Sequence, residues 1–507
     1  MVFEPSFTKV VSSTRKNLGT IQSVIDVKLP TNENNITEIY SVGGKSIIVS
    51  SSVVGSGVEF VGVVDIQAMY NSGEVSAIDY SVEFKDKFTQ NDDVVGEVVL
   101  NSNVIDISSS VVAGGVKVVA IVETSIDVIE NKEINVLTKV DGEKVYSSMK
   151  EISYATYVGR AFEKFDVSEN IVINNAEKIY TVTPSVCVTN VVPKENYVSV
   201  EGVVGLDICY GVNDEISGIR SNYNTIDFQW EIALDGIEEN SYIQSQVSLL
   251  TNEIKITTAI EDGNANMNIN LPINYSGYVF KDNNIEVVDD VYLEDNYLSI
   301  TSENFDTING ESWIRFKDNI SGTASILESS PFIDEVLGVS ANNIVLASSV
   351  IRNDVLAIEG IVNSTVLYYT KDSNSMSSVV VEMPFVVEEK VKGEFAQIVT
   401  LCVSGITAKS KRGKEIEVSA ELVAFSDIYN TSINNVISTI VMGDEKPKED
   451  CSLYIYIAKP NQTLWDIAKD MGVSVDLIRE QNPELMTDVV FNGGEKIIIY
   501  KPQVVMY

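Results

Sequence analysis

The chain has 507 residues, 44% of them apolar and 21% charged, and its 73 acidic and 36 basic residues give a formal net charge of -37. This length exceeds what one hydrophobic core usually supports, so several domains are expected. The negative charge repels phosphate groups, which excludes nucleic acid and anionic lipid as expected partners. No apolar run approaches the roughly 20 residues of a membrane span, so no membrane insertion is expected.

Histidine is absent from the sequence. Its absence removes the commonest general base, the Ser-His and Cys-His couples and the usual zinc ligand. We therefore predict a protein that is not an enzyme and that has no catalytic residue, no cofactor and no metal site.

The cysteines and the first ten residues of the chain indicate the cellular compartment. The four cysteines, Cys187, Cys209, Cys402 and Cys451, show no C-x-x-C spacing. We predict that they are reduced and mostly buried thiols, because free cysteine packs as a small apolar side chain. The first ten residues lack the basic and apolar regions of a secretory signal, so the cytosol is the expected compartment.

Strand patterns follow one another through the first 440 residues. Val, Ile, Tyr and Phe alternate or run together, bounded by Asn, Asp, Gly and Ser, most clearly in residues 58–70, 116–122, 198–210, 355–369 and 415–425. The predicted fold class is mainly β, with antiparallel domains that are sandwich-like or barrel-like.

A domain-sized repeat runs through these strands. Gly62, Gly202 and Gly360 each precede a tyrosine by eight residues, namely Tyr70, Tyr210 and Tyr368. Tyr40 and Tyr180 both lie 22 residues before the glycine of their copy, where the third copy has Val336-Leu337-Gly338-Val339, and the following strands end in Phe84, Phe228 and Phe385. We interpret the glycine as a bulge or bend that the fold requires, with the tyrosine on the same sheet face covering the bare backbone. The repeat predicts β domains at residues 1–155, 156–310 and 311–442.

A different unit follows a charged linker at residues 443–450 and occupies residues 451–507. Residues 453–458 alternate as a strand, Thr463 and Asp466 can cap a first helix that Gly472 ends, and Ser474 can cap a second helix that ends near Asn482. A strand over residues 496–500 completes a βααβ order.

This unit resembles a LysM module in Tyr456-Ile457-Ala458-Lys459-Pro460, Thr463-Leu464-Trp465-Asp466-Ile467-Ala468, Asn482-Pro483 and Gly494-Glu495-Lys496-Ile497. The resemblance implies a groove for N-acetylglucosamine polymers between the loop before the first helix and the loop after the second. By position, the groove is lined by Asn461, Gln462, Thr463, Leu464, Pro483, Glu484, Leu485 and Met486.

The module departs from the LysM pattern at Asn461-Gln462, and it has a large aromatic residue, Trp465, in its first helix. LysM modules usually have Gly-Asp where this chain has Asn461-Gln462, and this departure favours a protein over a glycan as ligand. Trp465 is predicted to pack against the module's own helices, because large aromatic side chains are mostly structural.

Nearly the whole chain is similar to the SPOCS-domain plus LysM proteins of spore-forming Clostridia. The similarity rests on the repeated Gly and Tyr pattern, on the phrase Val287-Val288-Asp289-Asp290-Val291-Tyr292 and on the terminal module. It implies an adaptor in spore-coat or spore-envelope assembly that works in the mother-cell cytosol at the forespore surface. Its LysM module would then dock onto a coat protein such as the coat-assembly ATPase.

The sequence is also compatible with two other functions. The chain is a peptidoglycan-binding protein of the cell or spore surface if the module binds glycan. It is a self-assembling subunit of a coat layer or appendage if the β domains pair edge to edge, as a homo-oligomer.

Overall fold

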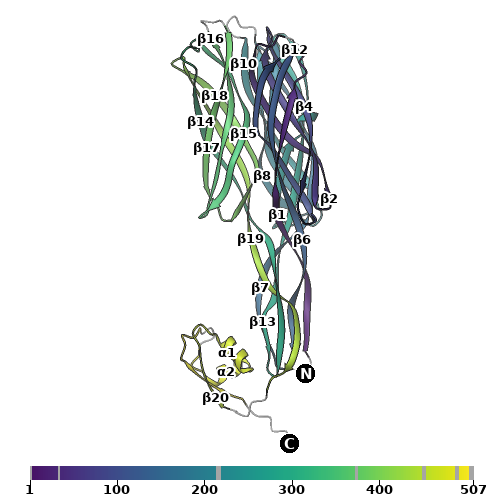
Figure 1. Ribbon diagram of the computed structural model, residues 1–507, viewed down its shortest axis with the longest axis vertical. Helices are drawn as coiled ribbons and strands as arrows, with labels where there is room; N and C mark the ends of the chain where they lie inside the picture. Colours follow the sequence, from purple (N-terminus) through teal and green to yellow (C-terminus); the bar gives the residue numbers. More distant parts are fainter. Residues whose placement is uncertain are drawn as a thin grey trace.

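The computed structural model describes residues 3–31, 35–212, 218–370, 375–447, 453–485 and 490–501. Three β units form an elongated head that narrows into a stalk, and a small C-terminal module lies beside the foot of the stalk (Figure 1). The structure confirms the mainly β fold class with a small βααβ module at its end.

Each unit consists of long antiparallel strands. Unit 1 contains β1 (Phe3–Lys28), β2 (Glu38–Val54), β3 (Gly57–Asn71), β4 (Val75–Thr89), β5 (Glu97–Val112) and β6 (Gly115–Gly142). Unit 2 contains β7 (Val145–Asn174), β8 (Lys178–Lys194), β9 (Tyr197–Gly211), β10 (Ile219–Ala233), β11 (Tyr242–Leu249), the short 3-10 helix η1 (Thr251–Glu253), β12 (Lys255–Glu261) and β13 (Asn264–Leu293). Unit 3 contains β14 (Asn296–Ser325), β15 (Glu335–Arg352), β16 (Val355–Thr370), β17 (Ser375–Lys390), β18 (Phe395–Lys411) and β19 (Glu415–Glu445).

Two sheets pack face to face within each unit. In unit 1 the sheet β1-β6-β5 covers the sheet β2-β3-β4, and unit 3 repeats this order with β14-β19-β18 and β15-β16-β17. Unit 2 has β10-β9-β8 as one sheet, and in its other sheet β13 pairs with β7, β11 and β12. Each unit has its own apolar core, built from the buried alternate residues of both sheets.

The unit boundaries lie at the foot of the stalk. The first strand of each unit pairs with its last strand along nearly its whole length, so β1 pairs with β6, β7 with β13 and β14 with β19. The chain passes from one unit to the next in short turns at residues 143–144 and 294–295. The expected boundaries after residues 155 and 310 therefore fall inside β7 and β14, and the first three residues of the expected linker, 443–445, continue β19.

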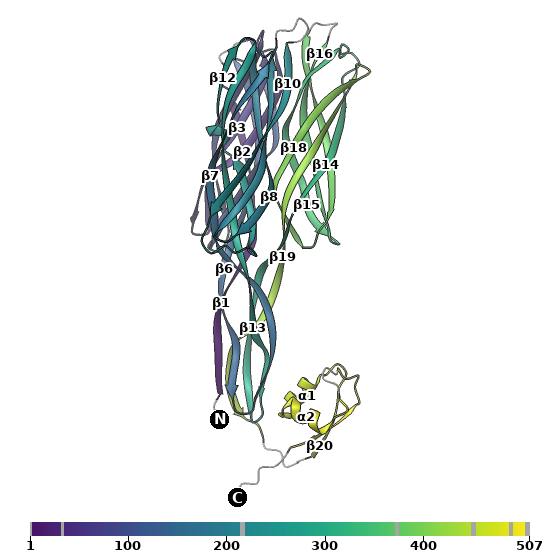
Figure 2. The ribbon, with the colours of Figure 1, turned by 180° about the vertical axis from the view of Figure 1, so that it is seen from behind.

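The stalk is made of the lower halves of these six long strands (Figure 2). Two apolar clusters fill it, and each contains residues from all three units: Val10, Ile134, Val136, Ile152, Val287, Phe305 and Val436 in one, and Leu137, Val288, Val291, Ile437 and Ile440 in the other. Because a two-stranded ribbon alone is marginally stable, the three ribbons depend on this shared core.

The repeated glycine makes room for an aromatic ring. Gly62 pairs directly with Phe84, and a Cβ atom at Gly62 would lie 2.4 Å from the Phe84 ring. Gly202 and Gly360 stand in the same relation to Phe228 and Phe385. A bulge does accompany each glycine, but it lies in the neighbouring strand, at Ile48/Ser50, Val188/Asn190 and Leu346/Ser348. The phenylalanine, rather than the expected tyrosine, covers the glycine, because it is the directly opposite residue.

A second bulge in the same strands joins the units. It lies at Ile39/Ser41 in β2, Ile179/Thr181 in β8 and Val336/Gly338 in β15. The extra residues are Tyr40, Tyr180 and Leu337, which meet in one apolar cluster with residues of all three units. The corresponding positions of the three repeats therefore all contribute to the apolar contact between the units.

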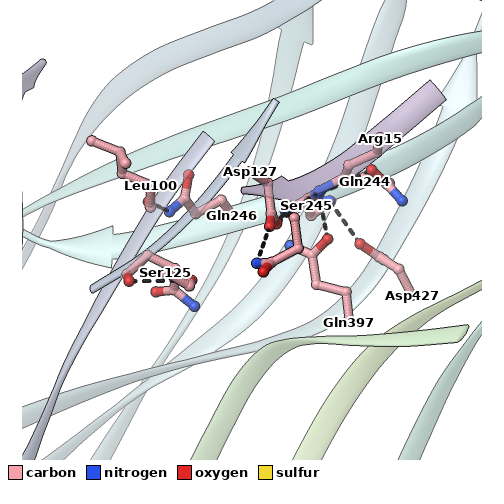
Figure 3. Close-up of polar contacts among 11 residues, drawn as sticks. Arg15, Leu100, Ser125, Asp127, Gln244, Ser245, Gln246, Gln397 and Asp427 are labelled. Atoms are coloured by element: carbon pink, nitrogen blue, oxygen red, sulfur yellow. Dashed lines mark hydrogen bonds and ion pairs between the residues drawn. The ribbon is translucent and has the colours of Figure 1, made fainter. Parts of the chain in front are cut away.

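A polar network crosses the centre of the head (Figure 3). The Arg15 guanidinium of unit 1 is 2.6 Å from the Asp127 carboxylate and donates to Gln244 of unit 2 at 2.9 Å and to Gln397 of unit 3. Its side chain is only 6% exposed. One guanidinium thus hydrogen-bonds to side chains of all three units, which requires a single relative placement of the units.

Asp427 lies in the same network and is fully buried. Its carboxyl accepts a hydrogen bond from the Ser245 backbone N–H at 2.9 Å. Burial raises the pKa of Asp427 well above its ordinary value, although this hydrogen bond and Arg15 oppose the shift.

Cys187 of β8 and Cys402 of β18 form a disulfide that joins unit 2 to unit 3, with Cα atoms 6.1 Å apart. The prediction of reduced thiols is therefore wrong for these two residues. The two cysteines are 215 residues apart, and only the packing of units 2 and 3 brings them together. Cys209 is a free, buried thiol as predicted, and Cys451 lies outside the described residues.

We predict that Arg15→Ala lowers the free energy of unfolding by about 3–5 kcal/mol, because it leaves the Asp127 carboxylate without its buried partner. Lys16→Ala is the matched control, since the Lys16–Glu130 pair is largely exposed and contributes below about 1 kcal/mol. Urea unfolding of both variants checks this, and equal losses would contradict the central role of Arg15.

We predict that a non-reducing digest yields a peptide in which Cys187 is joined to Cys402. Reductant should then lower the unfolding midpoint of the wild type, since disulfides typically contribute about 2–4 kcal/mol. The Cys187→Ser variant should not respond to reductant. A wild-type midpoint that is the same with and without reductant would refute the structural role.

Candidate functional site

The C-terminal module has the predicted βααβ order. It contains β20 (Leu453–Ile457), α1 (Leu464–Met471), α2 (Val475–Gln481) and β21 (Lys496–Tyr500). The predicted caps are confirmed: Thr463 and Asp466 form a capping box on α1, Gly472 ends α1 with φ +63°, and Ser474 caps α2. Asn482 ends α2 and joins it to β21, accepting a hydrogen bond from the Ile498 N–H at 2.8 Å.

The loop before α1 pairs with residues 490 and 491, which follow the second-loop residues that were expected to line the groove. The Asn461 N–H donates to the Phe491 carbonyl at 2.8 Å, the Phe491 N–H donates to the Gln462 carbonyl at 2.9 Å, and Thr463 forms a bridge with Val490. Asn461, Pro483 and Glu484 are exposed, Gln462, Thr463 and Leu485 are half-buried, and Leu464 is buried in the module core. Met486 lies outside the described residues.

The loop at Asn461 and Gln462 has a backbone conformation that a Gly-Asp pair could also adopt. Asn461 has φ +65°, in the left-handed region where glycine is favoured and asparagine is tolerated better than most residues. The Gln462 side-chain oxygen accepts a hydrogen bond from the Lys459 N–H at 2.8 Å, a role that an aspartate could also take. A Gly-Asp pair could adopt the same local conformation, so the departure at these two positions counts less against a glycan ligand than we expected.

The module packs against the foot of the stalk through α1. The Trp465 ring meets the Tyr292 ring edge-on, with centroids 5.0 Å apart, and its indole Nε1 donates to the Asp290 carboxylate at 2.9 Å. Tyr292 is 4% exposed, belongs to the module's apolar cluster, and donates its hydroxyl to the Val473 carbonyl at 2.7 Å. Trp465 packs with the module's apolar cluster, as we expected, and it also contacts the stalk, which we did not expect.

Asp290 carries the polar part of this contact. Lys469, one turn after Trp465, donates to both carboxylate oxygens at 2.7 Å. Burial alone would raise the pKa of Asp290, but the hydrogen bonds from Lys469 and Trp465 outweigh burial and hold that pKa below its ordinary value. Asp290 and Tyr292 belong to the segment 287–292, on which part of the family resemblance rests. The sequence of this segment did not predict a contact with the module.

The backbone at the foot is close to the end of α1. A Cβ atom at Gly472 would lie 3.0 Å from the Glu294 carbonyl oxygen. Gly472 thus serves both the left-handed end of the helix and the close approach of the stalk.

A second candidate region is a cavity of about 450 Å³ where the three units meet in the head. Lys45 is half-buried there and donates to the Pro184 carbonyl of unit 2, near Asp207. Burial lowers the pKa of Lys45 to about 8, although Asp207 opposes the shift, and burial raises the pKa of Asp207 to about 6, although Lys45 opposes it. The polar side chains in its walls bond across the unit boundary, as Thr183 does to Gln67 at 2.6 Å, so we assign the cavity to inter-unit contact.

We predict that Asp290→Asn loosens the module from the stalk, because the amide cannot replace the charge that faces Lys469. Trypsin should cut the segment around Lys446 and Lys448 at least several-fold faster in this variant than in wild type. Asp289→Asn is the matched control, since the Asp289–Lys150 pair lies within the stalk. Unchanged cleavage in Asp290→Asn would contradict the docked arrangement.

The docking should also weaken in acid. The pKa of Asp290 is depressed in the folded protein, so its contribution is complete above the ordinary value of 3.8 and is lost as the pH falls through the lower folded value. The same cleavage assay with an acid-active protease checks the direction of this change.

The comparisons with known proteins identify the module alone. Residues 456–493 match the LysM domain family. No curated protein matches the chain, and no solved structure matches it. Among the described helices, none is long and apolar enough to cross a membrane. The βααβ geometry and this match together show that the chain carries a LysM domain, held against a β stalk.

Proposed function

We propose that the protein is a non-enzymatic glycan-binding protein that recognises polymers of N-acetylglucosamine, as in peptidoglycan, through its LysM groove. The observation that supports this most is the loop at Asn461 and Gln462, whose backbone shape is maintained by the left-handed asparagine and the Gln462–Lys459 hydrogen bond. The stalk contacts α1 through Trp465 and Lys469, which leaves Asn461, Pro483 and Glu484 exposed for a ligand.

The β units then serve as a spacer. The module is attached at the foot of the stalk, while the head extends away from it (Figure 1). The Cys187–Cys402 disulfide favours this function over a permanently cytosolic one, since disulfides persist in oxidising compartments.

A second proposal is the adaptor role in spore-coat or spore-envelope assembly, at the forespore surface in the mother-cell cytosol. It is supported by the resemblance to SPOCS-domain plus LysM proteins and by the common bulges and glycines of the three units. Retention of the coat-assembly ATPase by the full chain, lost when residues 451–507 are removed, would support it. Electron microscopy of the concentrated protein separates both proposals from a self-assembling coat or appendage subunit, which should form ordered arrays.

We predict that the full chain sediments with purified peptidoglycan and that Asn461→Val weakens this binding about tenfold. A β-branched residue is strained at φ +65°, so the groove loop must change shape. Asn461→Gly is the matched control, because glycine adopts this conformation freely and should keep wild-type binding. Failure of the wild type to sediment at low salt would remove the glycan proposal.

A further inference from the structure

The LysM domain exposes an apolar sheet face that neither its own helices nor the stalk covers. In the β20–β21 ladder, Ile455 stands opposite Ile498, Leu453 opposite Tyr500, and Ile457 opposite Lys496. Directly opposite residues of an antiparallel pair point to the same face. The exposed fractions of this face are 57% for Leu453, 66% for Ile455, 60% for Ile457, 50% for Ile498 and 50% for Tyr500.

The opposite face of the same ladder is the one that the domain uses for its own core. Ile497 and Ile499 are fully buried, and they pack with Ile467 and Ile478 of the two helices. A sheet with one solvated face normally alternates apolar and polar residues, so β20 and β21 should carry polar residues outside. They carry large apolar ones instead. Single exposed apolar residues are ordinary, but cross-strand neighbours of this kind form a continuous patch.

The stalk does not account for this patch. The contacts between the LysM domain and the stalk involve Trp465, Lys469, Gly472 and Val473, which belong to α1 and to the turn after it. The helices lie toward the stalk and β20 lies farther from it in both views (Figures 1 and 2).

The border of the patch is basic, although the protein as a whole is strongly acidic. Lys496 shares the face, and Lys459 lies just beyond Ile457 in the same alternation; both are exposed. In the part of the chain that the structure describes, neither ammonium group takes part in an ion pair. Two copies that met through this face would bring their lysines together, so the charge disfavours a second copy as the occupant.

We propose that this face docks a partner protein through an apolar helical face bordered by Asp and Glu. The apolar residues fill the patch, and the acidic border pairs with Lys459 and Lys496. The surface is separate from the glycan groove and is formed by other residues, so the inference goes beyond glycan binding and does not depend on it. One domain can then hold a glycan and a protein at the same time.

The test uses the full chain and two labelled amphipathic helical peptides, each with a leucine stripe, one flanked by Glu and the other by Lys. Fluorescence anisotropy should show that the Glu peptide binds at least tenfold more tightly than the Lys peptide. Ile455→Lys should weaken binding of the Glu peptide at least tenfold. Ile433→Lys is the matched control and should leave binding unchanged, since Ile433 is an exposed residue of β19, 72% exposed.

Three results would overturn the proposal. The first is equal binding of the two peptides, or no effect of Ile455→Lys. The second is self-association of the wild type in sedimentation velocity that Ile455→Lys abolishes, which would assign the face to a second copy. The third is that the full chain fails to bind the Glu peptide but a variant that ends at Lys501 binds it. This result would assign the face to residues 502–507 of the same chain.

Two measurements keep these results separate from other failures. The unfolding midpoint of Ile455→Lys should equal that of the wild type, because the replaced side chain lies in solvent. Its sedimentation with peptidoglycan should also be unchanged, so loss of peptide binding alone concerns the sheet face, and loss of glycan binding alone concerns the groove.

Discussion

The pairing of the first and last strand of each β unit is the constraint on which the rest of the structure depends. β1 and β6, β7 and β13, and β14 and β19 are hydrogen-bonded from the head to the foot of the stalk. Each ladder therefore contributes to a sandwich at its upper end and to the stalk at its lower end. Because every unit begins and ends at the foot, the chain enters the LysM domain there, beside Asp290 and Tyr292.

The three units could pack in many ways if only apolar surface held them together, since burial of apolar area is not directional. The contacts between them are specific instead. Arg15 reaches side chains of all three units, the bulge residues Tyr40 and Leu337 meet in one cluster, and Cys187 is bonded to Cys402. Hydrogen bonds and a disulfide restrict angle and distance, so these contacts allow one arrangement of the head.

The LysM domain presents three separate surfaces, of which one contacts the stalk and two have proposed binding roles. The α1 surface around Trp465 joins the stalk, the loops at Asn461 and Pro483 carry the proposed groove, and the outer face of β20 and β21 is apolar. Their separation matters because a small domain of this kind can bind two ligands only if neither blocks the other. The stalk contact contributes by holding the domain in one orientation relative to the head.

Local patterns in the sequence determined the β class, the three related units and the βααβ module with its caps, down to Thr463, Asp466, Gly472 and Ser474. These features depend on alternation, capping and turn residues within a few positions of one another, which the sequence contains directly. The unit boundaries were displaced by roughly a dozen residues, since strands of up to 31 residues are far longer than usual. Asp141-Gly142 does mark the turn after β6, but a single Asp-Gly turn signal does not distinguish a boundary between units from a hairpin within one.

Only the tertiary structure decided the Cys187–Cys402 bond, the Arg15 network, the docking of Trp465 on Tyr292 and Asp290, and the exposure of Ile455 and Ile498. Each of these joins residues that are far apart in the sequence or depends on which face another element covers. Alternation along β20 showed two faces, but it did not show which face the helices would take. Burial is a property of the packed chain, and for that reason the sequence alone predicted a groove by resemblance but did not reveal the apolar face of β20 and β21.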